Sequence, residues 1–88
     1  MRESVIETHL VKRVTALGGE IRKVSWIGRR GAPDRFVMLP EGCFWVELKA
    51  PGKTTEPHQE REHARLRKMG QIVLVLDSIE SIDEWLAK

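Results

Sequence analysis

Apolar residues recur at helical spacing near the start of the chain. The stripe consists of Ile6, Leu10, Val14 and Leu17. This spacing predicts a helix over Ser4–Leu17. Ser4 and Glu7 fit a capping box, in which both side chains bond to free backbone amides at the helix start. Gly18-Gly19 predicts the end of the helix, because glycine tolerates the left-handed conformation found there.

Four shorter segments have the apolar density of β-strands. Their ranges are Ile21–Trp26, Phe36–Leu39, Cys43–Lys49 and Gln71–Leu76. The turn sequence Pro40-Glu41-Gly42 separates the second from the third, so we expect these two to form a hairpin. The last segment contains five consecutive apolar residues, which predicts a strand buried on both faces.

Two further helices are predicted in the second half of the chain. Thr55 is a candidate cap for the first, which has Pro57 in its first turn, runs to about Met69 and ends at Gly70. Ser78 caps the second, whose apolar positions are Ile79, Ile82, Trp85 and Leu86. The order α-β-β-β-α-β-α predicts an α/β fold with a mixed sheet flanked by helices. The crossover helix would make the last strand parallel to the Cys43 strand.

Length and composition limit the classes of protein. A chain of 88 residues fits a single domain, residues 1–88, and a core this small makes a homo-oligomer an option. The one cysteine, Cys43, excludes an intrachain disulfide and a cysteine-based zinc cage. The sequence has neither a membrane-length apolar run nor a signal-peptide pattern, so we expect a cytoplasmic protein with no membrane partner.

Basic residues concentrate in the middle of the chain, although the net charge is only +2. Arg29 and Arg30 lie in a glycine-flanked loop, where they are candidates for contacts to nucleic-acid phosphates. The alternative is a solvated loop. The other candidates for such contacts are Arg35, Lys53, Arg61 and Arg65.

The candidate chemistry begins with Glu47-Leu48-Lys49. Side chains alternate along a strand, so Glu47 and Lys49 share one face and Leu48 lies on the core face with Phe44 and Val46. A charged, solvated strand face is the alternative. Asp34, fixed after Pro33 at the entry to the Phe36 strand, also has an ordinary alternative as a residue at a loop-to-strand junction.

The joint pattern is more specific than either part. A hairpin can place Asp34 beside Glu47, and paired carboxylates bind Mg²⁺ or Mn²⁺ through hard oxygen ligands. Such a metal polarises a phosphodiester and lowers the pKa of a bound water. Lys49 is a cation that can orient that water, stabilise the developing charge or act as a base. Hydrolysis of a phosphodiester needs these groups.

Helical residues supply further candidates. Glu7 lies within the apolar arc of the first helix, which favours a cation or a metal as its partner, with the capping box as the alternative. Gln59 lies on a face of the second helix that is unusually polar for one that must cover a sheet, which makes it a candidate site residue. The alternative is a helix that is only partly exposed. His58 and His63 have no accompanying ligand pattern, and we expect structural or surface roles for them, with contact to DNA phosphate as the alternative.

Together these segments resemble the VRR-NUC nuclease domain of the PD-(D/E)XK superfamily. The resemblance rests on Gly31-Ala32-Pro33-Asp34-Arg35, Phe44 to Gly52, Gln59, Leu66, and Gly70 before an apolar strand. It implies a restriction-endonuclease-like fold, with Asp34, Glu47 and the backbone carbonyl of Leu48 binding the metal. It also implies Lys49 and Gln59 as active-site residues and Glu7 as an additional acidic member.

The resemblance also implies a function. Small stand-alone members occur in phages and bacteria, and others are fused to DNA-repair proteins. The small ones resemble structure-selective endonucleases that act as homodimers on branched DNA such as four-way (Holliday) junctions. Two alternatives stay open: a non-catalytic nucleic-acid-binding module on the same fold, and a structural protein whose strand charges are merely solvated.

Overall fold

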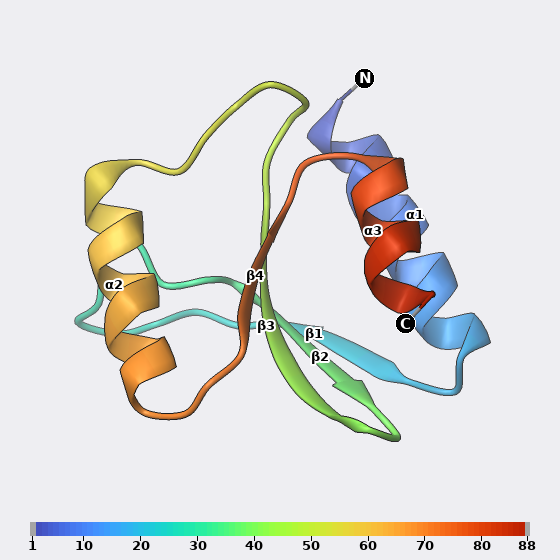
Figure 1. The fold of residues 1–88 in the computed structure, drawn as a ribbon, viewed down its shortest axis with the longest axis horizontal. Helices are drawn as coiled ribbons and strands as arrows, with labels where there is room; N and C mark the ends of the chain where they lie inside the picture. The colour runs from blue at the N-terminus through green and yellow to red at the C-terminus, as the bar shows by residue number, and fades with distance from the viewer. Residues whose placement is uncertain (1, 88) are drawn as a thin grey trace.

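A computed structural model describes residues 2–87. Its elements, in chain order, are α1 (Glu3–Ala16), β1 (Glu20–Lys23), β2 (Arg35–Leu39), β3 (Gly42–Leu48), α2 (Pro57–Lys68), β4 (Val73–Leu76) and α3 (Ile79–Leu86). The predicted α/β class and the order α-β-β-β-α-β-α are confirmed (Figure 1). The first strand is shorter than predicted and ends at Lys23, three residues before Trp26.

The four strands form one mixed sheet in the order β1-β2-β3-β4. The first three are antiparallel neighbours, and β2 and β3 form the predicted hairpin across the turn at Pro40 and Glu41. β4 returns through α2 and pairs parallel with β3, as the crossover predicted. β3 is therefore paired on both of its sides, which fixes the strand that carries Glu47.

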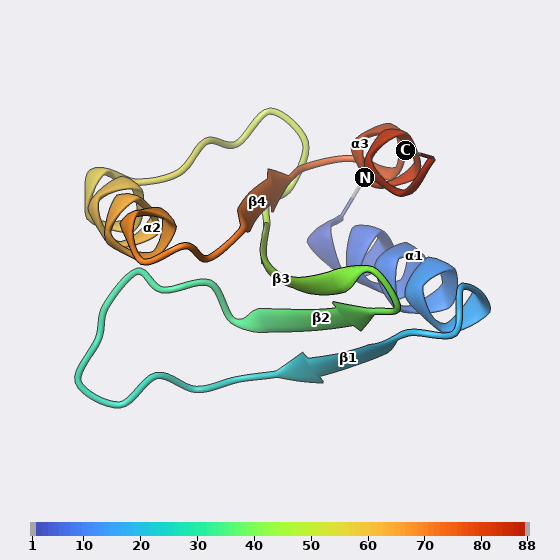
Figure 2. The same cartoon turned by 60° about the horizontal axis from the view of Figure 1, so that its bottom comes forward.

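Helices cover the two faces of the sheet unequally. α1 and α3 lie together on one side of the strands, and α2 lies on the other (Figures 1 and 2). The core forms between the sheet and the α1–α3 pair. Its buried members are Ile6, Leu10, Val14, Val37, Val46, Leu48, Leu76 and Ile82. Because Val46 and Leu48 face this core, the intervening Glu47 faces the side of α2.

The predicted helix caps are right for one helix and wrong for two. Ser78 accepts a hydrogen bond from the backbone of Ser81 and caps α3 as predicted. α1 begins at Glu3, so Ser4 lies inside its first turn and makes no capping bond. The N-cap of α2 is Glu56; the hydroxyl of Thr55 donates instead to the carboxylate of Glu60. Both errors shift the helix start by one or two residues.

The expectation that the last strand is buried on both faces is wrong. β4 stands at the edge of the sheet, and within residues 2–87 only β3 pairs with it. Val75 is 38% exposed, and Ile72, just before the strand, is 49% exposed. A run of apolar residues indicates burial only if both faces are covered, and α2 leaves part of this strand open. No helix within residues 2–87 is long and apolar enough to cross a membrane.

Candidate active site

The register of the β2–β3 hairpin brings the two predicted acidic residues together. Arg35 pairs with Val46 and Phe36 with Trp45, so continuing the register by one residue sets Asp34 opposite Glu47. Directly opposed residues on antiparallel strands have Cβ atoms about 4.5–5.5 Å apart. A backbone hydrogen bond of 2.9 Å, from the amide of Val24 to the carbonyl of Asp34, holds this position against the chain that follows β1.

Glu47 carries the most perturbed carboxyl group of the site. Burial, with a smaller contribution from the negative charge of Asp34, raises the pKa of Glu47 to about 7 against the opposing charge of Lys49. The side chain of Glu47 is only 13% exposed. Burial destabilises the ionised form of this carboxyl group, because it removes water that would otherwise stabilise the negative charge. Glu3, at the start of α1, also raises this pKa and was not predicted from the sequence.

Helix α2 connects the site through Gln59. The ammonium of Lys49 donates to Oε1 of Gln59 over 2.8 Å, and Nε2 of Gln59 lies 3.5 Å from Oε2 of Glu47. The backbone amide of Glu56 donates to the same Oε1 over 2.9 Å. The start of α2 therefore fixes the amide group of Gln59, which lies between the predicted catalytic lysine and the predicted acidic ligand.

Arg35 connects Glu7, the acidic candidate on α1, to the β2–β3 hairpin. It is 8% exposed, and its guanidinium pairs with Glu7 of α1 and, over 2.8 Å, with Asp34. These two carboxylates raise the pKa of Arg35 in spite of its burial. Glu7 thus meets a cation, one of the two partners that its place in the apolar arc predicted. Arg35 itself is held inside the protein, in contrast to the DNA contact predicted for it.

Residues 24–34 form a loop whose base is closed by aromatic packing. Trp26 donates to the carbonyl of Pro33 over 2.7 Å, and its ring lies 4.9 Å from that of Trp45. Trp45 also packs on Phe36, at 4.5 Å between ring centroids. Arg29 and Arg30 are exposed in this loop, and Arg29 lies 3.9 Å from the buried carboxylate of Glu62 on α2. The two arginines are therefore exposed on the loop that leads to Asp34, with Arg29 close to α2.

Gly31 is the point at which the loop meets α2. Its φ is +85°, and a Cβ there would lie 2.9 Å from the carbonyl oxygen of His58 and 3.0 Å from Cα of Gln59. We expect Gly31→Ala to lower the free energy of unfolding by about 2–4 kcal/mol, from left-handed strain together with a backbone clash. Urea denaturation monitored by circular dichroism measures the loss.

Gly28→Ala is the matched control for this prediction. Gly28 has a φ of +76°, but a Cβ there meets nothing within 4 Å. The control therefore carries the strain of the left-handed conformation, about 1–2 kcal/mol, without the clash. Equal losses for the two variants would mean that the contact between the loop and α2 does not restrain Gly31.

The remaining predicted contacts lie on the surface near the site. Lys53 is exposed in the segment between β3 and α2, and Arg61 is exposed on α2. Arg65 is also exposed but pairs with Glu62 over 2.8 Å. Within residues 2–87, no group of three His, Cys, Asp or Glu side chains is arranged to hold a metal ion. A metal here would therefore rest on Asp34 and Glu47 rather than on a complete protein cage.

The sequence predicts a structural or surface role for His63, and the structure places its ring against the candidate site. It is fully buried on α2, and Nε2 lies 3.9 Å from Oε1 of Glu47. Burial and the charge of Arg67 lower its pKa. The alternative of a DNA phosphate contact is wrong, because the ring does not reach the surface. The spacing of four residues from Gln59 is the signal that could have placed both side chains on one face of α2.

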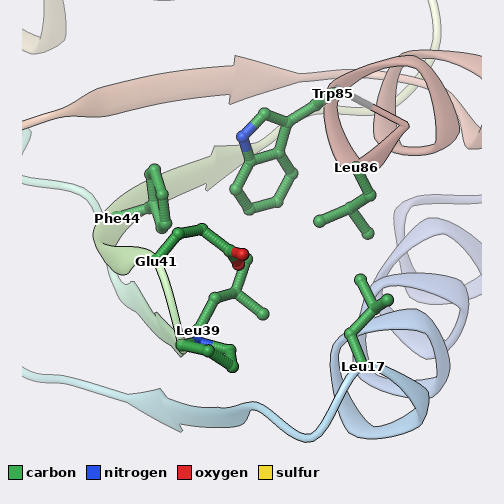
Figure 3. Close-up of a pocket in the computed structure, with 7 residues that line it drawn as sticks. Leu17, Leu39, Glu41, Phe44, Trp85 and Leu86 are labelled. Carbon is green, nitrogen blue, oxygen red and sulfur yellow. The ribbon is translucent and has the colours of Figure 1, made fainter.

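An apolar pocket lies at the other end of the β2–β3 hairpin. Figure 3 shows Trp85 and Leu86 of α3 across from Phe44 and Leu39, with Leu17 on the same side as Leu86 and Glu41 at the hairpin turn. The rings of Phe44 and Trp85 meet edge to face at 5.3 Å. No residue of the candidate site lines this pocket, so the two are separate features of the molecule.

Known proteins resemble the chain over nearly its whole length. No family model matches it. The phage protein "Putative nuclease p44", from Acyrthosiphon pisum secondary endosymbiont phage 1, is 53% identical over 79 residues, which are 89% of this chain and 85% of the relative. A solved structure described as "VRR_NUC domain" superposes with a TM-score of 0.89 at 41% identity, covering 97% of this chain and 94% of that one. The chain therefore belongs to the VRR-NUC family of nucleases.

Proposed function

We propose that the protein is a metal-dependent DNA endonuclease that hydrolyses phosphodiester bonds with Asp34, Glu47, Lys49 and Gln59. The observation that carries the proposal is the register that sets Asp34 opposite Glu47, with Lys49 linked to the same group through Gln59. A binding module needs the surface arginines but has no use for a buried carboxylate whose pKa is raised to about 7. Family membership favours the enzyme over a structural protein.

The donor set suits a hard divalent cation such as Mg²⁺ or Mn²⁺. The partly buried carboxylate of Glu47 faces the charge of Asp34, and a cation between them would relieve that repulsion. Mg²⁺ ordinarily takes one or two protein carboxylates and completes its shell with water and substrate phosphate. Asp34, Glu47 and the backbone carbonyl of Leu48 would hold the ion, and Glu7 would act through Arg35. When bound, the ion activates water and polarises the phosphate.

The side chains of the chain itself position the reacting groups. Lys49 supplies a positive charge beside the scissile phosphate, where charge develops on oxygen during attack by water. Gln59 accepts from Lys49, so the ammonium keeps its direction, and the amide of Gln59 faces Glu47. Arg35 restrains Asp34 by pairing with its carboxylate, and Glu7 restrains Arg35 in turn. Phosphodiester hydrolysis thus takes place at the junction of β3, the Asp34 loop and α2.

The exposed basic residues beside the site would contact DNA phosphates. They are Arg29, Arg30, Lys53 and Arg61.

We expect Arg30→Ala to weaken the binding of all DNA sequences alike, because phosphate contacts carry no sequence information. The slope of log K against log salt should fall by about one unit. Fluorescence anisotropy over a salt series measures it, with Lys12→Ala, an exposed charge on α1, as control. An unchanged slope for Arg30→Ala would remove this loop from the interface.

We propose branched DNA as the substrate and a homodimer as the acting form, in the cytoplasm of a bacterial or phage-infected cell. The resemblance to small stand-alone family members supports both. The open edge of β4, beside exposed Ile72 and Val75, offers a surface for a second copy. We expect sedimentation velocity at micromolar concentration to give twice the mass of the 10.1 kDa chain. A monomer throughout that range would contradict the dimer.

Cleavage of a labelled four-way DNA junction, beside a linear duplex of matched sequence, tests the substrate. The reactions contain Mg²⁺ or Mn²⁺, or a chelator in their place. Metal-dependent cutting of the junction alone supports the endonuclease and its selectivity. Cutting of both substrates keeps the nuclease and removes the preference for branches. Binding of DNA without cutting in either metal would favour the non-catalytic binding module.

A further inference from the structure

His63 is a buried polar group with no partner inside the described chain. Its ring is fully enclosed on α2, and neither Nδ1 nor Nε2 has a hydrogen-bond partner among residues 2–87. Such a group costs free energy, because it gives up its bonds to water and gains none. A ring kept only to fill space would be replaced at lower cost by an apolar side chain of similar volume. The position therefore suggests a use for one of the ring nitrogens.

The atom that His63 faces is an oxygen of the site. Nε2 lies 3.9 Å from Oε1 of Glu47, while the other oxygen, Oε2, lies 3.5 Å from Nε2 of Gln59. Gln59 and His63 are four residues apart, so both project from the same face of α2. The helix thus offers one nitrogen to each oxygen of the Glu47 carboxylate. The His63 distance exceeds a hydrogen bond, and a small movement of either side chain would close it.

We propose that His63 is a positioning residue, whose neutral ring donates from Nε2 to Oε1 of Glu47 and holds that carboxylate in the orientation that binds the divalent cation. This rests on the proposed function, since it assumes a cation at Glu47. A neutral imidazole has one N–H donor and one acceptor nitrogen, so the Nε2–H form would satisfy the donor and leave only Nδ1 as an acceptor. Ionised carboxylates accept the stronger hydrogen bonds, so the cation and the ring favour the same state of Glu47.

The position explains why the group is buried. Partners that orient a metal ligand act by fixing its side chain, and such partners lie behind the ligand rather than in the substrate path. His63 lies beneath Glu47 in the part of α2 that faces the sheet, where it cannot reach DNA. Lys49 and Gln59 then remain free to act on the exposed side of the same carboxylate.

Nitrogen NMR of the wild-type protein is the first test. Long-range proton–nitrogen correlation spectra of the ¹⁵N-labelled full chain, without and with Mg²⁺, identify which ring nitrogen of His63 carries the proton. We expect the Nε2–H form, with the Nε2 signal shifting toward a hydrogen-bonded donor when Mg²⁺ is added. If backbone signals around Glu47 respond to Mg²⁺ but His63 carries its proton on Nδ1, the positioning role is wrong. If Mg²⁺ moves no signal of the protein, the proposed function fails and this inference fails with it.

Two substitutions provide the second test. His63→Leu keeps an apolar filling but removes the donor, and His63→Gln restores a donor. We expect His63→Leu to raise the Mg²⁺ concentration for half-maximal cleavage by about 10–100-fold, the usual cost of losing an orienting partner. His63→Gln should recover most of it. Equal effects of both variants, or no effect of either, would overturn the proposal. If His63→Leu does not fold, as circular dichroism would reveal, the NMR result on the wild type decides.

Discussion

Glu47→Gln is expected to stabilise the metal-free protein at pH 8 by on the order of 3 kcal/mol. At that pH the wild type must hold an ionised carboxylate in a partly buried position, where its pKa is raised from 4.5 to about 7. Glutamine has a similar shape and carries no charge, so it avoids this cost. For a chain of this size the gain corresponds to a rise in melting temperature of more than about 10 °C.

The pH dependence of this gain follows from the sign of the shift. A carboxyl group whose pKa is raised by folding binds more protons in the folded state than in the unfolded state between pH 4.5 and about 7. The wild type therefore keeps the contribution of Glu47 to stability below pH 4.5 and loses it as the pH rises to about 7. The advantage of Glu47→Gln should grow over the same interval and be constant above it.

Thermal melting of the two proteins from pH 4 to pH 8, with chelator, measures the effect. Glu84→Gln, which removes an exposed carboxylate on α3, is the matched control and should show little change. Addition of Mg²⁺ at pH 8 should raise the melting temperature of the wild type and not that of Glu47→Gln, because binding stabilises only the protein that holds the ion. A variant no more stable than the wild type at pH 8 would mean that burial of Glu47 imposes no cost.

Lys49→Ala should lower the rate of DNA cleavage by about 10²–10³-fold, the usual loss when one group that stabilises transition-state charge is removed. The ammonium is held by Gln59 over 2.8 Å and lies on the same face as Glu47. Its loss should leave the affinity for DNA nearly unchanged, because most of the phosphate contacts come from other residues. Single-turnover cleavage at saturating enzyme separates the chemical step from binding.

Lys68→Ala is the control for the loss of one positive charge. Lys68 is exposed at the last residue of α2, at the opposite end of this helix from Gln59. It should cleave DNA at the wild-type rate. A similar fall in both variants would indicate that general electrostatic attraction, rather than a charge at the scissile phosphate, accounts for the effect of Lys49.

The sequence was sufficient for the strands that carry the site. Alternation fixed the face shared by Glu47 and Lys49, and the turn at Pro40 to Gly42 fixed the hairpin that sets Asp34 opposite Glu47. Both depend on neighbours in the chain, which local pattern describes well. Family resemblance added Gln59, and the structure brings its amide to Lys49.

Features that depend on packing between distant segments could not be predicted from the local pattern of the sequence. The exposure of Val75 depends on how much of β4 is covered by α2. The apolar content of the strand does not specify that coverage. The pairing of Glu7 with Arg35 joins residues 28 positions apart, so the helix pattern could only narrow the partner to a cation or a metal. His63 has the appearance of an ordinary helical histidine until its ring is found enclosed against Glu47.

Removal and return of the metal most directly tests whether DNA cleavage depends on a metal ion held by Asp34 and Glu47. Labelled DNA is incubated with wild type or Asp34→Asn in chelator, and Mg²⁺ or Mn²⁺ is then added in excess. We predict no cleavage in chelator, cleavage by the wild type once the metal is returned, and none above background by Asp34→Asn. Cleavage that persists in chelator, or that Asp34→Asn carries out at the wild-type rate, would contradict a nuclease whose metal rests on Asp34 and Glu47.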